Sequence, residues 1–346
     1  MAEFYDITKW NEKPWYQTGG TRSKVIVENP STHKDYYFKT SLKRELKDYK
    51  YEYWSEIIAS EVGDLLGFDM LKYDIAFNRG EMGCISKSMV TEGRNKLTEG
   101  ISYLTGYDNT YNPDDKNSKK QYTFQLICKS LKYFQLDRYI EKIIEIIILD
   151  SIIGNGDRHQ ENWGIVTEYS DVVKILEEIA QKRIPGNLAK SIFSILGITS
   201  KAKSDDAAKL AKEFHLKMPG RFSQIYDSGS CLGRELDDNR LKQMLTDNSM
   251  LEAYIRRGVS EIHWKGEKLN HFELIKEINK IYPEAVKKIV LRVKKKFDEQ
   301  VIRKSIENID LKLPQELEEH KLPNERKEFV IKLIALRVQT LIRFVE

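Results

Sequence analysis

The chain has 346 residues, of which 40% are hydrophobic and 32% charged, and its formal net charge is +4. A single hydrophobic core stops growing at about 250 to 300 residues, so this length predicts two lobes with a cleft between them. The small net charge does not indicate a nucleic-acid partner and leaves the class of substrate open. Direct nucleic-acid binding is not expected.

Cysteine usage and hydropathy indicate the cellular compartment of the protein. The three cysteines are odd in number and far apart, without the paired spacing of a zinc site or the density of a secreted disulfide scaffold. The first residues, MAEFYDITKWNEKPWY, lack the apolar core of a signal peptide. The most apolar stretch, at 143–153, is short and carries Glu145 and Asp150. We expect a cytoplasmic protein without a membrane span.

The N-terminal part of the chain is typical of a small β-rich lobe. Residues 24–28, KVIVE, and 36–39, YYFK, flank the turn-prone NPSTHKD and predict an antiparallel hairpin. A helix is expected at 52–66, where apolar residues recur at helical spacing and Gly67 is a typical terminator. Two further strands are expected in MLKYDIAFNRG and MGCISKSMV, so this lobe ends near Met89.

The remainder of the chain is mainly helical in pattern. Residues 107–121 are rich in Asn, Asp and Lys and predict a mobile loop. Helical periodicity then runs from Phe124 to Gly154 and resumes from Asp237 to the end. Between these stretches, residues 167–220 hold three short helical patterns, VVKILEEIAQKRI, LAKSIFSILGI and DAAKLAKEF. We interpret this segment as an inserted helical subdomain.

One short polar loop carries the residues most typical of a catalytic site. The string NxDRHxxN occurs in LDSIIGNGDRHQENWGIV and comprises Asn155, Asp157, Arg158, His159 and Asn162. In phosphoryl transfer one carboxylate accepts the proton of the incoming hydroxyl, while an amide oxygen and a second carboxylate hold Mg²⁺ on the nucleotide phosphates. Asp157 and Asn162 suit the first two roles. The alternative is a polar turn, but such turns rarely need a fixed Arg-His pair as well.

The loop resembles that of the HipA-like protein kinases, and more closely that of the CtkA type of bacterial serine/threonine kinase. In these kinases a DxxxGNxDRHxxNWG string is followed later by FDxGSCL, and the second string is YDSGSCL here, at 226–232. The resemblance implies that Asp157 is the catalytic base, Asn162 a Mg²⁺ ligand and Asp227 the second metal carboxylate. His159 is expected beside the cofactor, where it stabilises the loop through hydrogen bonds. Asp150 and Asn155 are expected to brace the same loop.

Nucleotide phosphates also need a neighbouring cation, which protein kinases supply as a strand lysine held by a helix glutamate. Lys39 ends the strand YYFK, and Glu56 stands at the start of the next helix, so we pair these two residues. Glu61 is the alternative partner. Without the catalytic loop, both Lys39 and Glu56 would be interpreted as solvated surface groups.

A glycine loop is expected directly before the first hairpin strand. The string GGTRSK at 19–24 lies there and includes Gly19, Gly20, Thr21, Ser23 and Lys24. Glycines let backbone N–H groups approach phosphate oxygens closely. The glycine pair departs from the G-x-G-x-x-G of ordinary protein kinases. The resemblance makes Thr21 and Ser23 candidates for autophosphorylation, which displaces this loop in HipA-like kinases. The hinge is expected to begin at Met89, with backbone groups that hydrogen-bond the adenine.

These expectations describe an ATP- and Mg²⁺-dependent serine/threonine protein kinase with a two-lobed, protein-kinase-like α+β fold. The small lobe covers 1–91 and the helical lobe 92–346, which contains the insertion at 167–220. The expected partners are a protein substrate with a Ser or Thr hydroxyl and, from the resemblance, an antitoxin or regulator protein. The roles of toxin and translocated effector both stay open.

Two other functions are considered. Phosphoinositide kinases share a DRHxxN string, but the segment SGSCLGRELDDNR is mixed in charge and argues for a protein or soluble substrate rather than a lipid. A nucleotide-binding scaffold without catalysis would explain the incomplete glycine loop and the large insertion. The intact candidate base and metal residues count against that scaffold.

Overall fold

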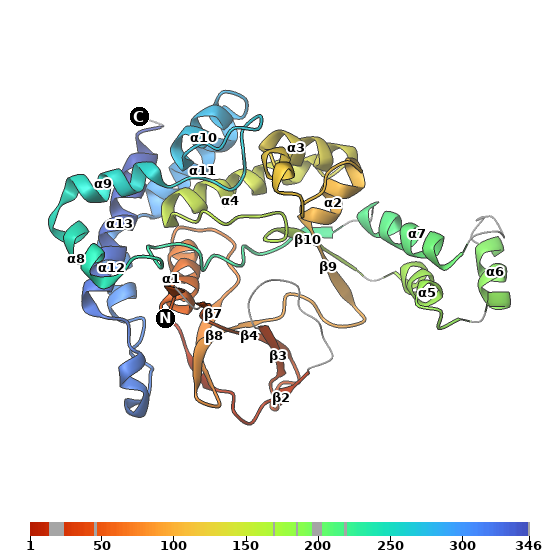
Figure 1. The fold of residues 1–346 in the computed structure, drawn as a ribbon, viewed down its shortest axis with the longest axis horizontal. Helices are drawn as coiled ribbons and strands as arrows, with labels where there is room; N and C mark the ends of the chain where they lie inside the picture. Colours follow the sequence, from red (N-terminus) through yellow and green to blue (C-terminus); the bar gives the residue numbers. More distant parts are fainter. Residues whose placement is uncertain are drawn as a thin grey trace.

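The computed structural model describes residues 1–13, 24–44, 47–168, 170–184, 186–195, 203–217 and 220–344. The expected glycine loop, with Gly19, Gly20, Thr21 and Ser23, lies outside the described residues. A curled β-sheet with one helix forms the N-terminal lobe, and helices make up most of the rest of the chain (Figure 1). The fold is therefore α+β and two-lobed, as the sequence predicted.

The N-terminal lobe is built on a six-stranded sheet with the order β1-β7-β8-β4-β3-β2. Its strands are β1 (Phe4–Asp6), β2 (Asn11–Glu12), β3 (Lys24–Glu28), β4 (Asp35–Thr40), β7 (Tyr73–Asn78) and β8 (Glu81–Lys87). Strands β3 and β4 form the predicted antiparallel hairpin, in which Lys24 lies directly opposite Lys39. Directly opposite side chains share one face of a sheet, so both lysines reach the same side.

The sequence did not predict four of the short strands in this lobe. β1 has 3 residues and pairs with β7 in parallel, while β2 has 2 residues and extends the other edge. Strands β5 (Lys43–Arg44) and β6 (Lys47–Asp48) form a separate pair. Strands of this length are too short to show the alternation of apolar and polar residues from which a strand is predicted.

Helix α1 (Glu52–Leu65) packs against β7 and β8 at the predicted place. Its Trp54 and Ile57 are buried with Ile75 of β7 in a core that continues into the second lobe. The helix ends before Gly67, whose φ of +86° is a left-handed conformation that glycine adopts without strain. A smaller apolar cluster contains Val27, Phe38 and Ile85 of three neighbouring strands.

Helix α4 forms the centre of the second lobe. The helices of this lobe are α2 (Gly100–Tyr107), α3 (Phe124–Tyr133), α4 (Ile140–Ile153), α8 (Asp238–Thr246), α9 (Asn248–Arg257), α10 (His271–Asn279), α11 (Pro283–Lys296), α12 (Glu299–Glu307) and α13 (Asn324–Ile342). Nearly every residue of α4 is buried, and α10, α11 and α13 pack around it. It ends at Gly154, with φ of +70°, so the NxDRHxxN loop begins from the most buried helix of the lobe.

Short 3₁₀ helices complete the second lobe at Lys116–Gln121, Asp137–Tyr139 and Gln315–His320. The first of them lies in the polar stretch 107–121, which the sequence predicted as a loop. Tyr111 of that stretch is buried, and its hydroxyl lies 3.4 Å from Oε1 of Gln160. Over the described parts of the chain, helices with the length and apolarity needed to cross a membrane are absent.

A three-stranded sheet lies between the two lobes and carries a group of three helices. Strands β9 (Asn95–Glu99), β10 (Gly164–Glu168) and β11 (Gly220–Phe222) pair antiparallel in the order β11-β10-β9. Between β10 and β11 the chain forms α5 (Asp171–Ala180), α6 (Gly186–Ile195) and α7 (Ser204–Lys217). These helices share an apolar cluster of their own and project away from the rest of the molecule (Figure 1). We call α5–α7 the helical arm.

Candidate active site

Lys39 lies at the centre of a buried charged cluster. Its Nζ lies 3.2 Å from Oδ1 of Asp227 and 3.6 Å from Oε1 of Glu56. Burial alone would lower the pKa of Lys39, but the carboxylates of Asp227 and Glu56 outweigh burial and raise this pKa well above its ordinary value. The pairing predicted between Lys39 and Glu56 is therefore present, whereas the alternative, Glu61, pairs with the amine of Met1.

Two groups hold the segment that contains Asp227. The backbone N–H of Asp227 donates to the hydroxyl of Tyr73 at 3.3 Å, and the N–H of Ser228 donates to Oε1 of Glu56 at 3.1 Å. The φ of Asp227 is +55°, a left-handed conformation that is uncommon for a residue with a side chain. Such a conformation persists only where neighbouring contacts determine it, and it is a frequent feature of functional sites. Sequence reasoning did not identify Tyr73.

Lys24 contacts the other oxygen of the same carboxylate. Its Nζ lies 3.6 Å from Oδ2 of Asp227, so each carboxylate oxygen has a lysine nearby. Two lysines opposite each other on neighbouring strands repel, and negative charge between them relieves that repulsion. Lys24 and Lys39 therefore flank the Asp227 carboxylate from the same face of the sheet. The signal was present in the predicted hairpin, because the register of KVIVE and YYFK places these two lysines face to face.

Arg158 connects the two motif strings. Its guanidinium is 1% exposed and makes two hydrogen bonds to the carboxylate of Asp150, at 3.1 and 2.9 Å. It also donates to the carbonyl of Asn162 at 3.0 Å, to the carbonyl of Tyr226 at 2.6 Å and to Oγ of Ser228 at 3.0 Å. The NxDRHxxN loop and the YDSGSCL segment are thus held against each other by one buried cation. Asp150 braces the loop as predicted.

Asp157 is exposed at the surface, but hydrogen bonds hold its backbone and its carboxylate in place. Its N–H donates to Oδ1 of Asn155 at 3.2 Å, its carbonyl accepts from the amide of Asn162 at 2.9 Å, and Oδ2 accepts from the Ser230 hydroxyl at 3.0 Å. The side chain of Asn155 also donates to Asp150 at 3.0 Å, as expected of a bracing residue. A carboxylate that is both oriented and accessible is suited to accept a proton from a bound hydroxyl.

Among the described residues, the hydrogen-bonding neighbour of His159 belongs to its own loop and not to the Lys39 cluster. Its Nδ1 accepts a hydrogen bond from the N–H of Glu161 at 3.3 Å. With Asp157 it lines a depression of about 240 Å³. This contact fits the expected loop-stabilising role, whereas the expected cofactor contact stays a prediction.

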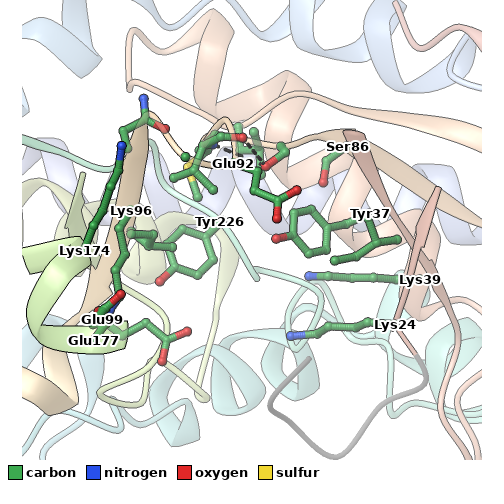
Figure 2. A pocket seen from close by; sticks show the side chains of 18 of the residues that line it. Lys24, Tyr37, Lys39, Ser86, Glu92, Lys96, Glu99, Lys174, Glu177 and Tyr226 are labelled. Carbon is green, nitrogen blue, oxygen red and sulfur yellow. Dashed lines mark hydrogen bonds and ion pairs between the residues drawn. The ribbon is translucent and has the colours of Figure 1, made fainter. Parts of the chain in front are cut away.

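A cavity of about 900 Å³ lies between the two lobes (Figure 2). Its lining includes Lys24, Lys39, Met89, Glu99 and Tyr226. Pockets for small molecules and cofactors measure about 300 to 1,000 Å³, so a nucleotide fits this volume. The hydroxyl of Tyr226 donates to the carbonyl of Glu161 at 2.7 Å, which connects the cavity wall to the loop of Asp157. Asp157, Asn162 and Asp227 are not part of the lining itself.

Two residues of this lining differ in how well they were predicted. Met89, the expected start of the hinge, borders the cavity, but its carbonyl accepts a hydrogen bond from Arg221 at 3.2 Å. Glu99 was not identified from the sequence. Burial is the main cause that raises the pKa of Glu99, and the nearby carboxylate of Glu161 raises it further. Its position at the end of β9, in a polar NKLTE string, provided no signal.

The residues present fit a magnesium ion held together with nucleotide phosphates. Mg²⁺ prefers oxygen ligands and is commonly bound by one or two carboxylates plus substrate phosphates. Asp227 supplies a carboxylate, and Asn162, a residue that is 4% exposed, supplies an amide oxygen. Within the described residues, groups of three or more His, Cys, Asp or Glu suited to a metal are absent, and a phosphate-assisted site does not require one.

Comparison with known proteins agrees with this geometry at the level of the fold. The chain is similar to the Helicobacter pylori proinflammatory kinase CtkA, with a TM-score of 0.70 and 16% sequence identity over 98% of this chain and 97% of that chain. HipA from the toxin–antitoxin system of Shewanella oneidensis MR-1, solved with HipB and operator DNA, gives a TM-score of 0.37 and 13% identity over 97% of this chain and 69% of that chain. No family model matches the sequence, and no curated protein matches it significantly. The chain has the fold of a CtkA-type kinase, which confirms the predicted resemblance for the fold.

Proposed function

We propose that this chain is an ATP- and Mg²⁺-dependent protein kinase that transfers the γ-phosphoryl group to a serine or threonine hydroxyl. The observation that carries the proposal is the convergence of Lys39, Glu56 and Asp227, from three separate elements, beside a cavity of nucleotide size. A strand lysine held by a helix glutamate next to a metal-binding aspartate is the arrangement by which protein kinases bind and orient nucleotide phosphates. Similarity to the fold of CtkA supports the same function.

In this proposal the two lysines bind the phosphates. Lys39 contacts phosphate oxygens while Glu56 keeps its ammonium in place, and Lys24 adds a second positive charge from the neighbouring strand. Backbone groups near Met89 bind the adenine. Asp227 and Asn162 hold Mg²⁺, which when bound neutralises charge on the β- and γ-phosphates. Gly19, Gly20, Thr21 and Ser23 remain the candidates for the loop that covers the phosphates.

Asp157 acts as the catalytic base in this proposal. The acceptor hydroxyl hydrogen-bonds to its carboxylate and gives up its proton there while the hydroxyl oxygen bonds to the γ-phosphorus. The bond between that phosphorus and the β–γ bridging oxygen breaks, and ADP leaves. The Ser230 hydroxyl, 3.0 Å from Oδ2 of Asp157, orients the carboxylate toward the acceptor. Arg158 keeps this base and the Asp227 segment in register.

The test is phosphate incorporation from labelled ATP. The Asp157→Asn and Asp227→Asn variants keep the shape of each side chain but remove its negative charge, so we expect loss of about 10³-fold or more in turnover, in line with removal of an essential group. Asp64→Asn, on the exposed side of α1, is the matched control and should keep full activity. Unchanged turnover in both site variants would refute the proposal.

The acceptor and the biological setting are tested separately. Purified chain is incubated with labelled ATP alone, with a bacterial lysate and with phosphoinositide vesicles. Label in protein supports a protein kinase, and label confined to lipid supports the phosphoinositide alternative. ATP binding without turnover under any divalent metal would favour the scaffold. We also propose a cytoplasmic toxin or effector role with a regulator protein as partner, and growth arrest on expression, relieved by such a partner, tests it.

A further inference from the structure

We propose that helix α5 of the helical arm is part of the nucleotide site and contacts the nucleoside portion of the bound nucleotide. The inference rests on the proposed function, because it takes the interlobe cavity as the ATP site. The helical arm would then be a specificity element of the kinase rather than an appendage.

One face of α5 forms a wall of the cavity. Lys174, Glu177, Glu178 and Gln181 line the cavity. Glu177 and Glu178 follow Lys174 by three and four residues, and Gln181, the C-cap, follows them by four and three, so all four lie toward one side of the helix. The other face, which includes Val173, packs into the apolar cluster of the helical arm. The division between the two faces gives α5 a polar surface toward the cavity and an apolar surface toward α7.

The α5 wall lies across the cavity from the phosphate-binding lysines. Figure 2 shows Lys174 and Glu177 on one side and Lys24 and Lys39 on the other. The proposed function places the phosphates at the two strand lysines beside Asp227, so the part of the nucleotide nearest α5 is the ribose with the outer edge of the base. Carboxylate, amide and ammonium groups suit that part, since ribose hydroxyls both donate and accept hydrogen bonds.

Two contacts hold the arm beside the cavity. Nζ of Lys96 on β9 lies 2.8 Å from Oε1 of Glu177 on α5. Nζ of Lys212 on α7 donates to Oγ1 of Thr105 on α2 at 3.2 Å. The first contact joins α5 to the three-stranded sheet and the second joins α7 to the second lobe, so α5 lies beside the cavity before any nucleotide binds. An exposed ion pair contributes little stability, so this wall can still adjust to a bound ligand.

The arm can be removed with little disturbance of the strands that carry it. Thr167 of β10 pairs directly with Gly220 of β11, so the chain leaves and re-enters the sheet at adjacent positions. Residues 168–219 can therefore be replaced by an Asn-Gly turn, which suits a two-residue hairpin. Leu216 packs into the main core, so removal of the arm also reduces stability. A double variant, Lys174→Ala with Gln181→Ala, avoids that effect because it leaves the fold of the arm intact.

The experiment compares ATP with adenosine by titration calorimetry. The armless variant and the double variant should each lower the affinity for ATP and for adenosine by the same factor. We expect about 5- to 10-fold, the size expected for one or two lost hydrogen bonds. Lys39→Met should lower the affinity for ATP far more than the affinity for adenosine, because Lys39 binds phosphate in the proposed function. Lys190→Ala on α6, exposed and away from the cavity lining, is the matched control and should bind both ligands as the unaltered chain does.

Three outcomes would overturn the inference. Unchanged affinity for both ligands in the double variant and in the armless variant would remove α5 from the site. A lower affinity for ATP with an unchanged affinity for adenosine would place α5 at the phosphates and contradict the nucleoside assignment. If the unaltered chain binds ATP, either of these results contradicts the inference about α5 and leaves the proposed function standing. An unaltered chain that binds neither ligand would overturn the proposed function together with it.

Discussion

On the sheet side of the cavity, the side chains of Lys39 and Glu56 are 8% and 2% exposed, and a second carboxylate, Asp227, contacts the same ammonium. On the α5 side, the side chains of Lys96 and Glu177 are 43% and 26% exposed and contact each other at 2.8 Å. A buried charge that loses its partner is strongly destabilising, whereas exposed ion pairs contribute about 0 to 1 kcal/mol. The sheet side of the cavity is therefore the rigid wall, and the α5 side is the adjustable wall.

This difference matches the roles proposed for the two walls. Chemistry at a phosphate requires charged groups fixed in place, because small displacements of a reacting group reduce the rate strongly. The nucleoside end needs affinity and selectivity, which tolerate adjustment. The same rigidity extends behind the sheet side, where Arg158 joins the NxDRHxxN loop to the Asp227 segment in the interior. The comparison predicts large effects of substitution on the rigid side and small effects on the α5 side.

The largest effect is expected from Arg158→Met. The substitution leaves Asp150 buried without its cation and also removes donors from the carbonyls of Asn162 and Tyr226. Loss of one partner from a buried ion pair destabilises by about 3 to 5 kcal/mol. Urea denaturation followed by circular dichroism should show a loss of that size in the free energy of unfolding.

The matched control for Arg158 is Arg303→Met. Arg303 pairs with Glu328 at 2.8 Å on the surface, with side chains 31% and 48% exposed. We expect this control to lose about 1 kcal/mol or less. The combined Arg158→Met and Asp150→Leu variant should recover part of the lost stability, because no unpaired charge remains. An equal loss of unfolding free energy in Arg158→Met and Arg303→Met would mean that buried Arg158 does not stabilise the NxDRHxxN loop.

A smaller effect is expected at the boundary of the rigid side, from Lys24→Gln. Lys24 lies 3.6 Å from Oδ2 of Asp227, so in the proposed function it competes with the divalent cation for that carboxylate. Without nucleotide, this variant should bind Mn²⁺, the paramagnetic substitute for Mg²⁺, about 2- to 10-fold more tightly, since a partly exposed ion pair contributes about 0.2 to 1 kcal/mol and somewhat more when half buried. Titration followed by electron paramagnetic resonance measures the binding constant.

Lys87→Gln, at the exposed end of β8, provides the same charge change away from Asp227 and should leave Mn²⁺ affinity unaltered. The Asp227→Asn variant should abolish the tighter binding. If Lys24→Gln and Lys87→Gln bind Mn²⁺ equally, Lys24 does not occupy the metal position. That result would reduce Lys24 to a surface lysine of the sheet.

The sequence predicted the rigid side better than the α5 side, for a physical reason. The hairpin and α1 have clear local periodicity, and a kinase-like pairing of Lys39 with Glu56 followed from their order in the chain. The contact of Lys39 with Asp227, which lie 188 positions apart, could be anticipated only because the YDSGSCL string resembles a known motif. Lys24 had a local signal, its register opposite Lys39, which we did not use.

Residues without a local signal were missed. Tyr73 lies in a strand pattern that any buried aromatic residue would satisfy, and its contact with the N–H of Asp227 arises from tertiary packing. The helices of the arm were predicted from their periodicity, but the position of α5 beside the cavity was not. That position depends on how β9, β10 and β11 pair, and β9, NKLTE, is too polar and short to be predicted as a strand.

The smallest effect is expected from the ion pair of the α5 wall. Glu177→Gln and Lys96→Gln each break a contact that contributes about 0.2 to 1 kcal/mol, so local opening of α5 should become about 1.5- to 5-fold more frequent. Amide hydrogen exchange without nucleotide, read by mass spectrometry, should show this acceleration in α5 and none in α4. Glu178→Gln, the next residue on the same helix, is the control and should leave exchange unchanged. Faster amide exchange in α4 as well, or unchanged exchange in α5, would mean that the Lys96–Glu177 ion pair does not act specifically on the α5 wall.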